Sequence, residues 1–345
     1  MSAPLTAAVV LFLALVAVAL AGPRALHAAK LRLATTPRTA AIAVLTAGLA
    51  FTAALVGAAP MLAWSVDGPQ LLPGPAGQVC QQCLVAANPF SSVQPIPAGV
   101  PSAVLVGASA LIVMAIVVSV LRELLAQRRV CRSLPARWRQ SEGGSLTLDG
   151  VRVRIVEDPR PYAFSLPPRC GGVTVSRGAL DVLDDAEVRA VLAHEAAHVD
   201  RGHHRLAALT VGLTAPLRWI PFLSAVRTTV LELLEIDADA QALRRVGATA
   251  LVSALVTLQT AAAAHPEGAP EPAAASGALF VQGGTRGSGQ PGGRSARIAS
   301  LLGADGARRI WPTAGLAALV APASVMGVAV HVAGGIALLS GCAVL

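Results

Sequence analysis

The chain has 345 residues, of which 54% are apolar and only 13% are charged, and its mean hydropathy is positive. This composition excludes an ordinary soluble domain and indicates a membrane protein. The net charge of +8 does not point to direct nucleic-acid binding, because the sequence has no helix-turn-helix pattern and no basic face.

Four apolar stretches are long enough to cross a bilayer. Each has roughly 20 residues or more, the length at which a helix spans a hydrocarbon core of about 30 Å. They cover residues 3–22, 40–64, 102–121 and 314–339. We therefore expect a mostly α membrane protein with four transmembrane helices, whose lipid partner is the bilayer.

Basic residues are unevenly distributed among the loops. Arg24, Lys30, Arg32 and Arg38 lie between the first two spans, and six arginines follow the third. The predicted outer loop, residues 67–101, contains no Lys or Arg. The positive-inside rule then predicts a multi-pass protein of the cytoplasmic membrane with both termini outside and residues 122–312 in the cytosol.

Four of the five cysteines bear on redox chemistry. Cys80 and Cys83 lie in the outer loop, where a disulfide, a redox role or no role is open, and zinc would need two more ligands. Cys131 and Cys170 are predicted to be cytosolic free thiols.

The segment after the third span begins with three β-like runs. They are "VRVRIVE" from Val151, "YAFSL" from Tyr162 and "GVTVS" from Gly172, separated by Pro- and Gly-rich turns, and they predict a small sheet. Asp184 followed by Glu187 is a helix-start signal. A second helical run starts near Thr228 and continues to residue 259.

These patterns divide the chain into five regions. Residues 1–125 hold the first three spans with the outer loop, and residues 126–264 form a cytosolic α+β domain. Residues 265–293, rich in Gly, Pro and Ala, are expected to be a flexible loop. Residues 294–312 are expected to form an amphipathic helix, and residues 313–345 hold the fourth span.

The stretch "VLAHEAAHVDRGHH", residues 191–204, carries four of the seven histidines. On a helix His194 and His198 lie on one face and can hold one ion, while Glu195 is placed to act as a general base beside it. This is the His-Glu-x-x-His pattern of zinc hydrolases. A polar helix face without a metal is the alternative.

A catalytic zinc needs a third protein ligand, and two residues compete for that place. His204 has the spacing of a third histidine, but that pattern requires glycine where Arg201 stands. Glu235 opens the motif "EIDAD", and Asp239, one turn later, can accept a hydrogen bond from a ligand histidine and fix its tautomer. We favour Glu235.

Membrane topology restricts this choice. Residues 206–226 are apolar, yet one crossing there would separate Glu235 from His198 by the bilayer, and the 37 positions between them are too few for two crossings. We expect this segment to lie on the membrane surface or to enter and return. A buried pair of core helices is the alternative.

The segments "YAFSL", "GGVTVSRGAL", "DDAEVRAVLAHEAAHVDRGHH" and "EIDAD", in this order, resemble the integral-membrane gluzincins over about residues 162–250. The resemblance is nearest to the BlaR/MecR type and more distant to the HtpX and CAAX prenyl protease type. It implies one catalytic Zn²⁺ held by His194, His198 and Glu235, with Glu195 as general base and acid and Asp239 behind the ligands.

The resemblance also implies a zinc metalloendopeptidase that cleaves a cytosolic or membrane-proximal protein. In the BlaR type the partner is a transcriptional repressor, so regulatory proteolysis and signal transduction are expected. We expect the C-terminal penicillin-binding sensor domain of that type to be lacking, because the chain stops at Leu345 without a Ser-x-x-Lys motif outside. Membrane protein quality control of the HtpX kind and a non-catalytic, zinc-stabilised scaffold are the alternatives.

Several further residues and one strand have both a functional and a structural interpretation. Tyr162 and Arg244 are candidates for stabilising an oxyanion, although a structural role is more typical of each. The run "YAFSL" could be an edge strand that pairs with an extended substrate or an ordinary sheet strand. Asp200 and His203 are expected to be exposed or to lie behind the ligands, and His331 to form a helix contact in the last span.

Overall fold

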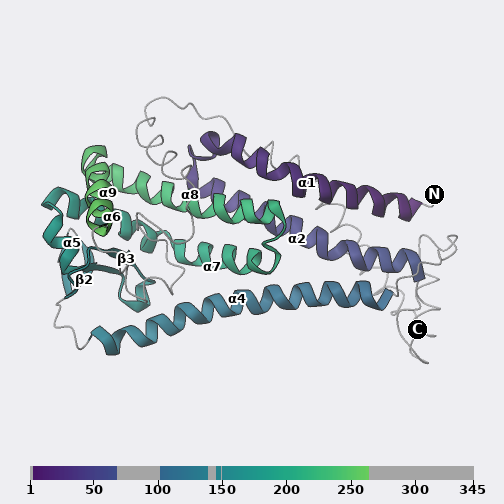
Figure 1. The fold of residues 1–345 in the computed structure, drawn as a ribbon, viewed down its shortest axis with the longest axis horizontal. Coiled ribbons are helices and arrows are strands. Elements are labelled where there is room, and N and C mark those ends of the chain that lie inside the picture. The colour runs from purple at the N-terminus through teal and green to yellow at the C-terminus, as the bar shows by residue number, and fades with distance from the viewer. Residues whose placement is uncertain (1–2, 68–101, 139–144, 149, 264–345) are drawn as a thin grey trace.

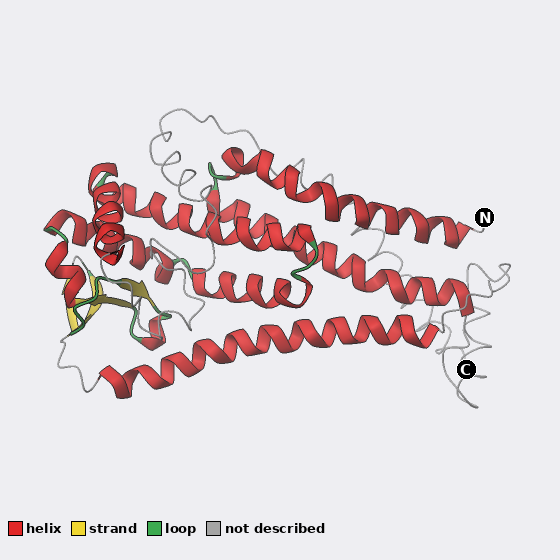
Figure 2. Cartoon of the chain, viewed as in Figure 1, coloured by secondary structure: helices red, strands yellow, loops and turns green. Residues whose placement is uncertain are grey.

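A computed structural model of the chain describes residues 3–67, 102–138, 145–148 and 150–263. Long helices run side by side along most of the molecule, and a small sheet with shorter helices lies at one end (Figures 1 and 2). The predicted outer loop with Cys80 and Cys83, the loop 265–293, the helix 294–312 and the fourth span with His331 lie outside the described residues.

Three of the four predicted spans are candidate transmembrane helices in this structure. The helices are α1 (Ala3–Leu33), α2 (Pro37–Asp67) and α4 (Ser102–Trp138), and their span-like parts are Val9–Leu33, Pro37–Ala59 and Val104–Arg129. α1 and α4 continue well past the predicted spans, because the Ala-, Leu- and Arg-rich sequence that follows each one favours helix. These three helices are long and apolar enough to cross a membrane.

The ambiguous segment 206–226 forms a helical hairpin. α7 (His203–Thr214) is joined through a 3₁₀ turn, η2 (Ala215–Leu217), to α8 (Pro221–Val246). The hairpin lies between α4 and the pair α1 and α2 (Figure 1). The arrangement matches the alternative of a buried pair of core helices, because residues of α7, η2 and α8 belong to the core formed with α1 and α2.

Small residues allow this close packing. The ring of Phe222 on α8 lies against Gly22 of α1 and meets Phe51 of α2 edge to face, with ring centroids 5.2 Å apart. Gly212 of α7 approaches the backbone of Val120 on α4 so closely that a methyl group would not fit without a shift. Glycine at such contacts is typical of helices packed within membranes.

The predicted helix from Thr228 to residue 259 was wrong at its start and in its continuity. α8 begins at Pro221, since proline is favoured in the first turn of a helix. It ends before Gly247, whose φ of 83° is a conformation that favours glycine, and α9 (Ala248–Ala263) follows as a separate helix. The predicted single run is thus two helices.

A four-stranded sheet contains the three predicted strands and one that the prediction missed. The strands are β1 (Ser145–Leu148), β2 (Val151–Val156), β3 (Ala163–Ser165) and β4 (Val173–Ser176). Their order is β1-β2-β4-β3, with β2 and β4 parallel and the outer pairs antiparallel. The Asp-Gly dipeptide before β2, with Gly150 at a φ of 77°, was the available signal for the β1–β2 hairpin.

Two helices follow the sheet, and the second carries the histidine motif. α5 (Arg177–Val182) leads into α6 (Asp185–Asp200), which starts with the expected capping box: Asp184 accepts from the Glu187 amide at 2.8 Å and Glu187 accepts from the Asp184 amide at 3.1 Å. Glu187 also accepts hydrogen bonds from Ser253 and Thr257 of α9. The start of α6 is therefore fixed both within the helix and against α9.

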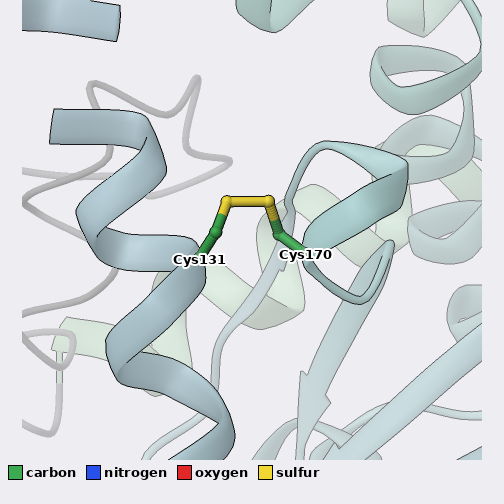
Figure 3. Close-up of a disulfide and its surroundings, with 2 residues drawn as sticks. All are labelled: Cys131 and Cys170. Atoms are coloured by element: carbon green, nitrogen blue, oxygen red, sulfur yellow. A yellow bond between two sulfur atoms is a disulfide. The ribbon is translucent and has the colours of Figure 1, made fainter. Parts of the chain in front are cut away.

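A disulfide corrects the prediction of free thiols at Cys131 and Cys170. Cys131 on α4 and Cys170 in the 3₁₀ turn η1 (Pro168–Cys170) are bonded across a Cα separation of 4.8 Å (Figure 3), which lies in the usual range for disulfides. The two cysteines are 39 positions apart, so only the tertiary fold reveals the pair. The bond ties α4 to the turn before β4.

Candidate metal centre

α6 places both motif histidines and the glutamate between them in the protein interior. His194 and His198 lie on one helical face, and the side chains of both, like that of Glu195, are almost fully buried. Alanines at positions 190, 193, 196 and 197 surround them on the helix and are buried as well. These small side chains let neighbouring helices approach the backbone of α6 closely.

α8 supplies the third candidate ligand. His194, His198 and Glu235 form the one group of potential metal ligands found among the described residues, with ligand atoms within 4.8 Å of one another. The two histidine Nε2 atoms are 3.1 Å apart. Glu235 Oε2 lies 3.7 Å from Nε2 of His194, and Oε1 lies 3.6 Å from Nε2 of His198.

These separations fit a zinc ion. Ligand atoms at tetrahedral positions about 2.1 Å from zinc lie about 3.4 Å from one another, close to the separations between the three side chains. All three belong to types that zinc accepts, and a set of two histidines and one glutamate leaves a fourth position for water or substrate. The residues present can therefore hold the cation that the sequence pattern implies.

Asp239 lies behind His194, one turn after Glu235 on α8. Its Oδ1 is 2.9 Å from Nδ1 of His194, so Nδ1–H donates to the carboxylate and Nε2 faces Glu235. Burial alone lowers the pKa of His194, but the hydrogen bond and charge of Asp239, with the charges of Glu235 and Glu195, outweigh burial and raise it. The electrostatics of the centre thus favour a positive charge at this place.

His198 has a different partner. Its Nδ1 lies 2.9 Å from Nδ1 of His203, and Nε2 of His203 lies 3.0 Å from Oδ2 of Asp237. Arg201 donates to the same carboxylate oxygen through Nε. The sequence placed His203 either on the surface or behind the ligands, and the structure buries it behind His198. The sequence reasoning missed Asp237 and Arg201, although Asp237 lies within "EIDAD".

His204, the alternative third ligand, lies outside the group. α6 ends at Asp200, and Gly202 with a φ of 65° starts α7 in a new direction. The backbone carbonyl of His204 accepts a hydrogen bond from Gln127 of α4. Burial, with the nearby His203, lowers the pKa of His204 to about 4, so this side chain is a neutral residue packed between helices.

The two oxyanion candidates occupy other positions. The Tyr162 hydroxyl donates to Asp158 at 3.2 Å, an aspartate that also forms an ion pair with Arg160, and burial raises the pKa of Tyr162. Arg244 is exposed at the end of α8.

Two other features considered from the sequence lie near α6. Asp200 is exposed and pairs with Arg245 at 3.5 Å. β3 forms one edge of the described sheet and lies beside α6.

Comparison with known proteins agrees with the metallopeptidase part of the resemblance. Residues 142–263 match the family model described as peptidase family M48. The chain is 36% identical over 85 residues to a protease HtpX homolog of Tropheryma whipplei (strain Twist), which is 24% of this chain and 29% of the relative. It is 41% identical over 66 residues to a protease HtpX homolog of Listeria monocytogenes serotype 4a (strain HCC23), covering 19% and 22%.

A protease HtpX homolog of Dictyoglomus thermophilum is 40% identical over 67 residues, covering 18% of this chain and 22% of the relative. The chain thus spans less than a third of the length of these curated relatives. No solved structure matches the chain significantly. The matches support a membrane metallopeptidase, and the BlaR/MecR type stays a prediction.

Proposed function

We propose that the chain is a zinc-dependent endopeptidase of the cytoplasmic membrane that hydrolyses peptide bonds of a cytosolic or membrane-proximal protein. The observation that carries this proposal is the convergence of His194, His198 and Glu235 within 4.8 Å, with Glu195 next to the first ligand on α6. In our proposal His194, His198 and Glu235 hold the ion, and Asp239 orients His194.

The chemistry then follows from where Glu195 lies. A zinc ion bound by these residues would lower the pKa of a water molecule and polarise the substrate carbonyl. The Glu195 carboxylate, buried on the same helix, accepts a proton from the attacking water and passes it to the amine that leaves. Burial suits this role, because exclusion of bulk water strengthens the electrostatic interactions of the site.

Substrate binding uses β3 in this proposal. An extended peptide that pairs with this edge strand receives main-chain hydrogen bonds, which hold the scissile bond in place without selecting a particular sequence. β3 is an edge strand of the described sheet and lies beside α6, and this position supports the role. Specificity for one partner then depends on how the substrate is presented to the site.

Regulatory cleavage of a cytosolic protein such as a transcriptional repressor is the biological role that we propose. A protease acting on membrane proteins, of the kind named in the HtpX matches, is the second candidate. A zinc-stabilised scaffold is less consistent with the site, because a structural zinc is usually closed by a fourth protein ligand and has no use for a neighbouring base.

Removal of zinc tests the proposed function. The purified full-length chain in detergent should hydrolyse an unfolded protein such as casein, and a zinc chelator should stop hydrolysis. Adding zinc back should restore cleavage, whereas magnesium should not, because the ligand set suits zinc. Cleavage fragments measured by mass spectrometry provide the readout, and hydrolysis that persists after complete zinc removal would contradict the proposal.

The position of the site relative to the spans predicts a minimum substrate reach. Lys30, near the end of the candidate span Val9–Leu33, pairs with Glu232 at 2.8 Å. Glu232 lies one turn before Glu235 on α8, which is about 5 Å along a helix. An extended chain rises about 3.3 Å per residue, so a membrane-anchored substrate needs only about two residues between its span and the cleaved bond.

A spacer series measures this reach. Reporter proteins with one transmembrane helix and a common cleavable segment, separated by two, six, twelve or twenty residues, are incubated with the chain in liposomes. We expect efficient cleavage already with two residues. Cleavage that begins only at twelve residues or more would show that the site lies well above the bilayer surface and would refute the prediction.

A further inference from the structure

We propose that His203 is a positioning residue for the metal centre, which holds the ring of His198 through a hydrogen bond and is itself held by Asp237. This inference rests on the proposed zinc site. It assigns a function to a histidine that is not a ligand and to an aspartate that the His-Glu-x-x-His motif does not include.

The direction of each hydrogen bond follows once Nε2 of His198 binds zinc, as proposed. Nε2 of His198 faces His194 and Glu235, so its other nitrogen, Nδ1, carries the hydrogen and donates to Nδ1 of His203 at 2.9 Å. His203 must then carry its hydrogen on Nε2, which donates to Oδ2 of Asp237 at 3.0 Å.

Burial protects these hydrogen bonds from exchange with water. His198 and His203 have 0% relative exposure and Asp237 has 3%, so bulk water cannot replace either hydrogen bond. Arg201 donates to the same oxygen of Asp237. It is the last group in the chain of hydrogen bonds that begins at His198. Packing alone does not require a carboxylate and a guanidinium at this position, whereas orienting an imidazole requires an acceptor that is itself oriented.

The two ligand histidines are thus held in different ways. A carboxylate contacts Nδ1 of His194 directly, while an imidazole separates His198 from its carboxylate. The turn at Gly202 produces this difference: five positions after His198 an uninterrupted helix would turn the next side chain away, but the left-handed φ of 65° starts α7 so that the His203 ring returns to His198.

Metal affinity and the spectrum of bound cobalt test the inference. Zinc is removed from the full-length chain, and the dissociation constant is measured by competition with a chromophoric chelator. Loss of a residue behind a ligand typically weakens metal binding by roughly 10–100-fold, and we expect this for His203→Leu. The visible absorption bands of bound Co²⁺ should also change, because they report the ligand geometry.

Two amide variants separate positioning from packing. In His203→Asn the side-chain oxygen lies near the place of Nδ1 and can accept from His198, whereas in His203→Gln the amide group reaches toward the place of Nε2. We expect Asn to recover affinity and the cobalt spectrum better than Gln. His204→Asn is the matched control, since the neighbouring side chain is buried but lies outside the ligand group, and it should bind zinc like the parent chain.

The outcomes are distinguishable. Affinity and spectrum unchanged in the His203 variants would overturn the positioning role, and so would equal losses in Asn, Gln and Leu, which indicate packing alone. If His203→Leu does not fold, the comparison of Asn with Gln decides. A parent chain that binds no zinc would refute the proposed function itself, whereas a parent chain that binds zinc and cleaves protein beside unaffected variants would refute only the role of His203.

Discussion

Glu195→Gln should abolish peptide hydrolysis and leave zinc bound. The amide has the size of the carboxylate but cannot accept a proton from water at neutral pH, and losing a general base typically costs about 10²–10⁴-fold in rate. Glu195 lies next to His194 but outside the group of three residues that could hold a metal ion, so we expect the zinc content to stay near one ion per chain. Cleavage rate and bound zinc are measured on the same sample.

The control is another carboxylate-to-amide change on a helix of this domain. Glu232 on α8 pairs with Lys30 at 2.8 Å, one turn from Glu235, and Glu232→Gln should keep both activity and zinc. Glu232 lies outside the ligand group, and glutamine keeps the size of the side chain, so the control should also fold. Full hydrolysis in Glu195→Gln would show that Glu195 is not the general base, whereas a parent chain that binds zinc and cleaves nothing would favour the scaffold alternative.

The part of the site that lies on one helix was predictable from the spacing of its residues in the sequence. His194 and His198 are four positions apart, which places them on one helical face, and the Asp184–Glu187 signal identified where that helix begins. Glu235 required a second step: no spacing rule links it to the histidines, and it was chosen for its chemistry and for a topology that keeps it on their side of the membrane. The structure brings it to them because α7 and α8 form a hairpin.

The contacts that depend on turns and on helix register were not predictable. His203 reaches His198 only because Gly202 redirects the chain, and Asp237 reaches His203 only because α8 packs against the start of α7. The same limit explains the missed disulfide: Cys131 and Cys170 belong to elements that the fold brings together, and their separation in sequence carries no signal. The expected helix through Gly247 failed for a local reason, a backbone conformation that favours glycine.

Glu235→Ala should remove zinc from the chain more completely than any change behind the ligands. Its two carboxylate oxygens face Nε2 of His194 and Nε2 of His198 at 3.7 and 3.6 Å, so the substitution leaves two imidazoles without the negative charge that balances the cation. We expect zinc affinity to fall by more than the roughly 10–100-fold that is typical when a residue hydrogen-bonded to a ligand is changed, with hydrolysis lost in parallel. Zinc per chain after dialysis, with the dissociation constant by chelator competition, measures the effect.

Two further variants make this result specific to the third ligand. Asp239→Asn, which weakens the hydrogen bond to Nδ1 of His194, should reduce zinc affinity within about 10–100-fold and so lie between Glu235→Ala and the parent chain. His204→Ala should retain zinc, because its imidazole lies outside the group formed by His194, His198 and Glu235. If His204→Ala loses zinc while Glu235→Ala keeps it, the third ligand is the histidine, and the carboxylate belongs to the surroundings of the metal.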